Sequence, residues 1–304
     1  MLVLKVVGTR EVMQSFLGMS PVLFTAALAL VLINTLLRTA NWFQLLNLFK
    51  QTSFKQSLLT YLAGSFYGKL LPASVGSDAA RAITISRRTS LDIRISVRSV
   101  VTLNLLGLAA VTALGAVGAL FLSLQNQTTF LLIVLVLSGT VAMVLCVLIF
   151  TKVGRWLKEA LSKVTDLWPA SYRILKPLLS VALLLPTARR SQLVMAAVAF
   201  SNQVIRVSVA ALVATSLGLT IDWWVFAAIA PLVAIVAMIP LSVFGVGLDQ
   251  GAKIFLLSHF GVAGSDAVAI SLTIASLHIL ISLVGGLAVI VDSAFGQRAI
   301  HGAR

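Results

Sequence analysis

Five long apolar stretches constrain the fold of this chain more than any other feature. A helix needs roughly 20 apolar residues to cross the hydrocarbon core of a bilayer. The chain is 59% hydrophobic and only 11% charged, whereas a soluble domain is about 25% charged. Because so few charged residues cannot cover the surface of a soluble fold, most of the surface of this protein must face lipid. We expect five membrane-spanning helices, at Pro21–Leu37, Ser99–Leu124, Phe130–Phe150, Leu193–Leu217 and Ala267–Val291.

Two further apolar stretches are interrupted by the same short phrase. Phe54–Leu71 and Trp223–Ile239 each stop at a proline. The pieces that resume, Ala79–Ile85 and Gln250–Phe260, are too short to span a bilayer. The interruptions read LPASVGSD and IPLSVFGVGLD, so both run Pro, any residue, Ser, Val, then glycine, then Asp. We therefore predict two broken helical hairpins.

The basic residues predict the orientation of the chain. Of 23 Lys and Arg residues, 17 fall in Arg38–Arg98 and Lys152–Arg190. The connections Gln125–Thr129, Gly218–Asp222 and Gly261–Asp266 contain none. The positive-inside rule places the two basic segments and the C-terminus in the cytoplasm. One broken segment then enters from the cytoplasm and the other from outside.

A shared phrase in opposite orientations is what an inverted-topology repeat leaves in a sequence. We predict an all-α polytopic membrane protein with about five spans and two oppositely oriented, re-entrant hairpins. Residues 1–304 form a single transmembrane domain, with pseudo-repeat halves at about 20–150 and 191–292. The basic cytoplasmic segment 151–190 joins these halves. The alternative is that the phrase occurs twice by coincidence, because it is short.

Several function classes are disfavoured. The net charge is +14, yet no basic cluster alternates with aromatic residues as in nucleic-acid binding. A single cysteine, Cys146, excludes a cysteine-rich metal site. No phosphate-binding glycine loop, HExxH or nucleophile elbow occurs. We therefore expect no cofactor, no metal and no nucleic-acid partner, and an enzyme is the less favoured class.

The two breaks are the first candidate site. Broken backbone survives in a membrane only where it is buried in protein or lines a wet cavity. A helix that resumes there points its N-terminal N–H groups at the site, which suits an anion. Asp78 and Asp249 open the resuming helices, where capping is the competing interpretation. The small residues of the two phrases complete this set: Ser74, Gly76, Ser242, Gly245 and Gly247.

A cation follows each aspartate by one helical turn. Arg81 lies three residues after Asp78, and Lys253 lies four residues after Asp249. Both spacings place the pair on one helix face, so helix-stabilising ion pairs are the alternative to ligand binding. A phosphate would suit Arg81, because a planar guanidinium binds two oxygens at once.

Polar residues inside or beside the spans add further candidates. Arg206 lies near the middle of a predicted span, where a charge normally faces water or a partner. A buried ion pair with one of the two aspartates is its alternative role. His278 and Asn104 also lie within spans, where hydrogen bonding between helices is the alternative. Lys69 directly precedes the first break and either lines the site or snorkels.

Three segments resemble the membrane region of the lysylphosphatidylglycerol synthase family. They are RTANWFQLL (38–46), SLLTYLAGSFYGKLLPASVGSDAAR (57–81) and IPLSVFGVGLDQGA (239–252). The resemblance covers about residues 25 to 290 and is to stand-alone members of the YbhN type, which lack the synthase domain. It implies a flippase-like region that moves aminoacylated phospholipid across the bilayer. For stand-alone members it implies the handling of lipids or lipid-linked sugars.

The chain departs from the family pattern in four places. Ser77 follows Gly76 where the family usually has a second glycine. Leu103 and Asn104 replace an acidic–Arg pair, and Gln250 replaces a glutamate. One N-terminal span of the family also has no counterpart here. The absence of these acidic residues argues against a proton-coupled step that they would carry.

These observations favour a lipid translocator in the bacterial inner membrane, with a cytoplasmic C-terminus. It would move an anionic or aminoacylated phospholipid or a lipid-linked sugar. One alternative is a non-catalytic subunit that anchors a separate synthase through Lys152–Arg190. Another is a membrane-embedded transferase with Asp78 as the base. The expected partners are anionic membrane lipids, a separate synthase or glycosyltransferase, and a second copy of the chain.

Overall fold

The computed structural model describes residues 19–70, 76–126, 137, 139, 188–237 and 248–301. Within these residues the chain is helical, and four helices are long and apolar enough to cross a membrane: α3, α6, α10 and α13. The predicted span Phe130–Phe150 and most of the basic connecting segment lie outside the described residues. The helices are α3 (Pro21–Leu46), α4 (Phe54–Leu70), α5 (Gly76–Thr89), α6 (Ile93–Asn126), α10 (Arg189–Ser216), α11 (Trp223–Ala237), α12 (Leu248–Ser258) and α13 (Gly264–His301).

Helix α3 is longer than the apolar stretch Pro21–Leu37, whose short length already left room for an extension past Arg38. It begins at Pro21, a residue favoured in the first helical turn. It continues past the predicted end at Leu37 to Leu46, because Trp42 and Leu45 are fully buried and extend its packed face. Arg38 therefore lies inside the helix and not in a cytoplasmic loop. Its charge is tolerated there because it faces a cavity, described below.

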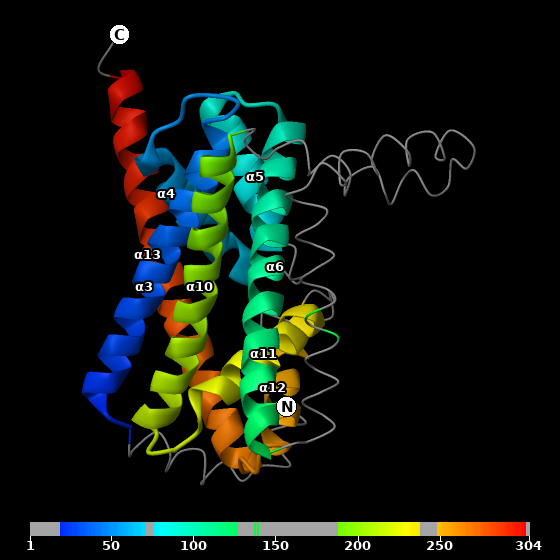
Figure 1. Cartoon of the computed structure of the whole chain (residues 1–304). Helices are drawn as coiled ribbons and strands as arrows, with labels where there is room; N and C mark the ends of the chain where they lie inside the picture. Colours follow the sequence, from blue (N-terminus) through cyan, green and yellow to red (C-terminus); the bar gives the residue numbers. More distant parts are fainter. Residues whose placement is uncertain are drawn as a thin grey trace, which may run out of the picture.

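Both predicted hairpins are present, and they enter the bundle from opposite ends (Figure 1). Helix α4 descends from the upper end in this view, and α5 returns to that end. Helix α11 rises from the lower end, and α12 returns to it. The interruptions at 71–75 and 238–247, which include Pro72 and Pro240, lie outside the described residues. Neither hairpin crosses the bundle as one unbroken helix.

The contacts between helices follow an inverted repeat. Helices α3 and α10 pack against each other, and each hairpin packs against the long helix of the other half. Thus α4 packs on α13, and α11 packs on α6. The lengths agree as well, with 26 and 28 residues for α3 and α10, and 34 and 38 for α6 and α13. The exact bounds of the two predicted halves stay a prediction, since much of 127–187 is not described.

Glycines set how closely the hairpins pack. In α4, Gly64 and Gly68 face α5, where a Cβ atom would collide with the side chain of Arg81 and with Ser77. Small residues four apart allow two helices in a membrane to approach closely. Close approach brings α5 against α4 along the whole first hairpin. This contact fixes the position of Arg81.

The hairpins meet the long helices through glycines at matching positions. Gly115 of α6 faces Pro231 of α11, and Gly285 of α13 faces the backbone of Leu62 in α4. Pro231 and Leu62 are each the ninth residue of their helix. The same close approach therefore occurs once in each half, as an inverted repeat requires.

The outer surface is apolar in the manner of a membrane protein. Large hydrophobic side chains on α3 and α13 are exposed, among them Leu32, Leu36, Leu283 and Leu287. Exposed apolar side chains on helices of this length are expected to face lipid tails. The protein is thus a multi-pass membrane protein, as predicted.

The orientation can be tested with single cysteines in a Cys146→Ala background. Gln51→Cys and Ser90→Cys flank the first hairpin, and Thr220→Cys and Ala263→Cys flank the second. We expect a membrane-impermeant thiol reagent, applied to intact cells, to label residues 220 and 263 but not 51 and 90. Labelling only one member of either pair would mean that the hairpin crosses the membrane.

Replacing Gly68 tests the close packing of the first hairpin. Gly68→Ala places a methyl group against the backbone of Ser77, and overpacking costs about 1–3 kcal/mol. Gly251→Ala is the matched control, since nothing lies within 4 Å of its added methyl group. Alanine there should stabilise the helix by about 0.5–1 kcal/mol. Unfolding in detergent measures both, and equal midpoints would refute the packing argument.

Candidate functional site

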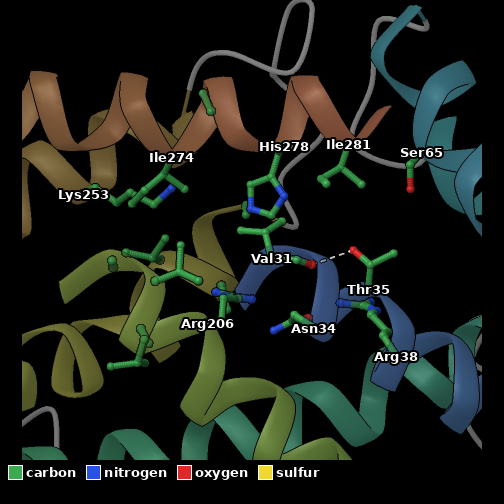
Figure 2. Close-up of a pocket in the computed structure, with 18 of the residues that line it drawn as sticks. Val31, Asn34, Thr35, Arg38, Ser65, Arg206, Lys253, Ile274, His278 and Ile281 are labelled. Atoms are coloured by element: carbon green, nitrogen blue, oxygen red, sulfur yellow. Dashed lines mark hydrogen bonds between the residues drawn. The ribbon is translucent and has the colours of Figure 1, made fainter. Parts of the chain in front are cut away.

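A cavity of about 550 Å³ lies between the two hairpins. The first hairpin contributes Gly68 and Lys69 to its wall, and the second contributes Gln250 and Lys253. Helices α3, α10 and α13 complete the lining (Figure 2). The two oppositely inserted hairpins therefore converge on one internal space, as the sequence predicted.

The cavity wall is strongly cationic. Figure 2 shows Arg38 of α3 and Arg206 of α10 on one side of this space, with Asn34 between them. His278 of α13 lies across from them. Among the described residues, five basic side chains line the cavity: Arg38, Lys69, Arg81, Arg206 and Lys253. They come from both halves of the repeat.

A second, smaller cavity of about 350 Å³ adjoins the first. It is lined by Asp78, Asn104 and Gln203, and it shares Arg38 and Arg206 with the larger cavity. The two arginines thus border both spaces. A ligand in either one would meet both guanidinium groups.

Asp78 is the centre of a hydrogen-bond chain through three helices. Arg81 Nη1 donates to Asp78 Oδ1 at 3.1 Å, and Asn104 Nδ2 donates to Asp78 Oδ2 at 2.6 Å. Arg38 Nη2 then donates to Asn104 Oδ1 at 2.7 Å. Both carboxylate oxygens of Asp78 accept from side chains. Asn104 makes the interhelical bonds expected of a polar residue in a span.

Arg81 is held firmly within the first hairpin. It is only 7% exposed, and its guanidinium carbon lies 4.0 Å from the ring centroid of Tyr61. Its Nη2 also donates to Ser65 Oγ at 3.3 Å. The ion pair with Asp78 matches the spacing of three seen in the sequence. The corresponding pair in the second hairpin stays a prediction, because the side chain of Asp249 lies outside the described residues.

Arg206 is exposed to the cavities instead of being buried. The carboxylate of Asp78 binds Arg81 and Asn104 and forms its ion pair with Arg81. An ion pair between Arg206 and Asp249 stays a prediction, because the side chain of Asp249 lies outside the described residues. A charge in the middle of a membrane helix is tolerated when it faces a wet cavity. The position of Arg206 therefore fits a site residue.

The remaining predicted residues divide into two groups. Lys69 and His278 line the larger cavity, and Gly76 is buried at the first position of α5. The other small residues of the two phrases lie outside the described residues, namely Ser74, Ser242, Gly245 and Gly247. Their roles stay predictions.

Sequence reasoning missed Arg38 as a site residue because it assigned this arginine to a basic cytoplasmic segment. A repeated phrase would have found it. Asn-x-x-x-Arg occurs at 34–38 and at 202–206. These phrases are 168 residues apart, and the amide nitrogen of Asn34 donates to the backbone carbonyl of Asn202 at 2.8 Å. The prolines at 72 and 240 have the same offset.

The two arginines of this phrase are structurally equivalent. Arg38 is the eighteenth residue of α3, and Arg206 is the eighteenth residue of α10. The inverted repeat therefore brings the same residue from each half to one place. Among the described residues, no group of three His, Cys, Asp or Glu side chains gathers to bind a metal.

Long apolar helices, two opposed hairpins and an internal polar cavity define a polytopic membrane protein of the inverted-repeat type. The chain belongs to the lysylphosphatidylglycerol synthase TM region family, whose sequence profile matches residues 1–286. The resemblance stated from the sequence is thereby confirmed. No curated protein and no solved structure matches the chain.

Asn104 is the most direct test of the hydrogen-bond chain. Asn104→Leu removes an acceptor from Arg38 and a donor from Asp78. Groups left unsatisfied inside a protein cost about 1–3 kcal/mol, so the thermal unfolding midpoint in detergent should fall. Val117→Leu, at an exposed position of the same helix, is the control and should change little. A midpoint for Asn104→Leu as high as that of the control would exclude the bridging role.

Proposed function

We propose that this protein translocates lipids across the bacterial inner membrane by receiving an anionic headgroup in the cavity between its hairpins. The observation that carries the proposal is the convergence of five basic side chains, from both halves of the repeat, on one space inside the bundle. The family fits a membrane protein related to lipid handling. The acyl chains would remain in the surrounding lipid.

The chemistry of the wall supports a phosphate-bearing headgroup. Arginine binds phosphate oxygens through two parallel hydrogen bonds, and charge-assisted bonds of this kind are the strong ones. Arg38 and Arg206 border both cavities. A headgroup passing between the two spaces would keep contact with both guanidinium groups.

The inverted repeat supplies a route to both sides of the membrane. In transporters of this design, one half moves against the other around a fixed central site. Here each hairpin reaches the cavity from a different end of the bundle. Movement of either hairpin would open the cavity toward its own side.

The transferase alternative makes Asp78 a general base. Both oxygens of that carboxylate already accept hydrogen bonds, from Arg81 and from Asn104. To take a proton from a substrate, Asp78 would first have to release one of these donors. This arrangement favours a structural role for Asp78 and a binding role for the cations around it.

A proteoliposome assay tests the translocation. Purified protein is reconstituted with one of two fluorescently labelled anionic lipids, phosphatidylglycerol or a prenyl diphosphate, and a membrane-impermeant quencher reports how fast inner-leaflet lipid becomes accessible. The rate should exceed that of protein-free liposomes. Arg206→Ala should lower it at least about tenfold, the effect of losing one charge-assisted hydrogen bond.

Arg94→Ala is the matched control, because Arg94 is exposed at the start of α6 and does not line either cavity. It should translocate at the wild-type rate. Equal rates for Arg206→Ala and the wild-type protein would remove the proposed site. A wild-type rate no faster than that of protein-free liposomes would remove the proposed function.

A further inference from the structure

We infer that the cavity selects a lipid diphosphate over headgroups with fewer negative charges, and excludes the cationic headgroup of an aminoacylated phospholipid. The inference rests on the proposed function, because it names the substrate class of the same site. The proposed substrate differs from the lysyl-phosphatidylglycerol that the family description suggests.

The balance of charge around the site carries the argument. Among the described side chains that line the two cavities, five are cationic and one, Asp78, is a carboxylate. If the carboxylate of Asp249 is counted as well, cations still exceed carboxylates by three. Charges interact strongly in the low dielectric of a membrane interior. The net positive charge of the lining therefore favours a ligand that carries several negative charges.

An aminoacylated phospholipid has the wrong charge for such a site. Its lysyl ester carries two ammonium groups and one phosphate, so its headgroup is cationic. Those ammonium groups would be placed among Arg38, Arg206 and Lys253, where like charges repel. A simple phosphodiester such as phosphatidylglycerol brings one negative charge and balances only part of the excess.

The placement of the two equivalent arginines favours two phosphate positions. Arg38 and Arg206 come from opposite halves and border both cavities. Each planar guanidinium can bind two oxygens of one phosphate group. A diphosphate can therefore meet one arginine with each phosphate. A monoester must bind between them.

Binding measurements on a matched ligand series test the inference. The full chain is placed in phosphatidylcholine nanodiscs, and dissociation constants are measured for farnesyl diphosphate, farnesyl monophosphate and farnesol. These three share one hydrocarbon chain and differ in charge. Phosphatidylglycerol and its lysyl ester form a second matched pair. Inorganic diphosphate distinguishes a free anion from a lipid headgroup.

We expect farnesyl diphosphate to bind at least about tenfold more tightly than the monophosphate, which is the gain from one further charge-assisted interaction. Farnesol should show no measurable binding, and lysyl-phosphatidylglycerol should bind at least about tenfold more weakly than phosphatidylglycerol. Arg38→Gln and Arg206→Gln should each reduce the preference for diphosphate to less than about threefold. Arg94→Gln, at an exposed site outside the cavities, should leave it unchanged.

Arg206 is exposed to the cavity, so Arg206→Gln keeps the test valid if Arg38→Gln disturbs folding. Equal affinity for diphosphate and monophosphate, or tighter binding of the lysyl ester than of phosphatidylglycerol, would overturn the inference. Inorganic diphosphate binding as tightly as farnesyl diphosphate would also overturn it, in favour of a soluble anion. If the expected affinities hold but no lipid is translocated, the proposed function fails and the selectivity of the site stands.

Discussion

Charged side chains inside a lipid-facing bundle must be kept out of hydrocarbon, and the architecture of this protein follows from that constraint. Five cations line an internal cavity, while the outer faces of α3 and α13 carry large apolar side chains. A mid-membrane charge without water or a partner costs at least about 2.5–3.5 kcal/mol. The two broken hairpins create the polar space that makes these charges tolerable. Without this space, Arg38 and Arg206 could not lie within apolar helices.

The hairpins depend in turn on close helix packing. Gly64 and Gly68 let α5 lie directly against α4, so that Asp78 and Arg81 reach Asn104 of α6 and Ser65 of α4. Packing and electrostatics therefore support each other. The hydrogen-bond chain from Arg81 through Asp78 and Asn104 to Arg38 ties three helices to one point at the cavity wall. This network positions the cations that line the site.

Much of this architecture was predictable from the sequence, because local hydropathy indicates both the membrane-spanning helices and the interruptions within them. The sequence predicted that the second broken segment resumes at Gln250, and the resuming helix α12 begins at Leu248. The basic residues predicted that the two hairpins enter from opposite ends, as they do in Figure 1. The bonding partners of Asp78 were not predictable. They depend on how α5 packs against α6, which no local pattern specifies.

Arg38 illustrates a different limit. In the sequence, its charge indicated a cytoplasmic segment, whereas in the structure α3 continues to Leu46 and contains it. The offset of 168 residues between the two Asn-x-x-x-Arg phrases was nevertheless present in the sequence. It becomes meaningful once α3 and α10 are seen as equivalent helices.

The most direct test of a wet, cation-lined cavity inside the membrane is the reactivity of a cysteine placed in its wall. Ala234→Cys, at a position that borders both cavities, is made in a Cys146→Ala background and treated with anionic and cationic thiol reagents of equal size. Leu283→Cys, on the lipid-facing surface, is the reference. We predict that position 234 reacts and that the anionic reagent is faster by at least about tenfold. A position 234 as unreactive as position 283, or one that prefers the cationic reagent, would contradict the account.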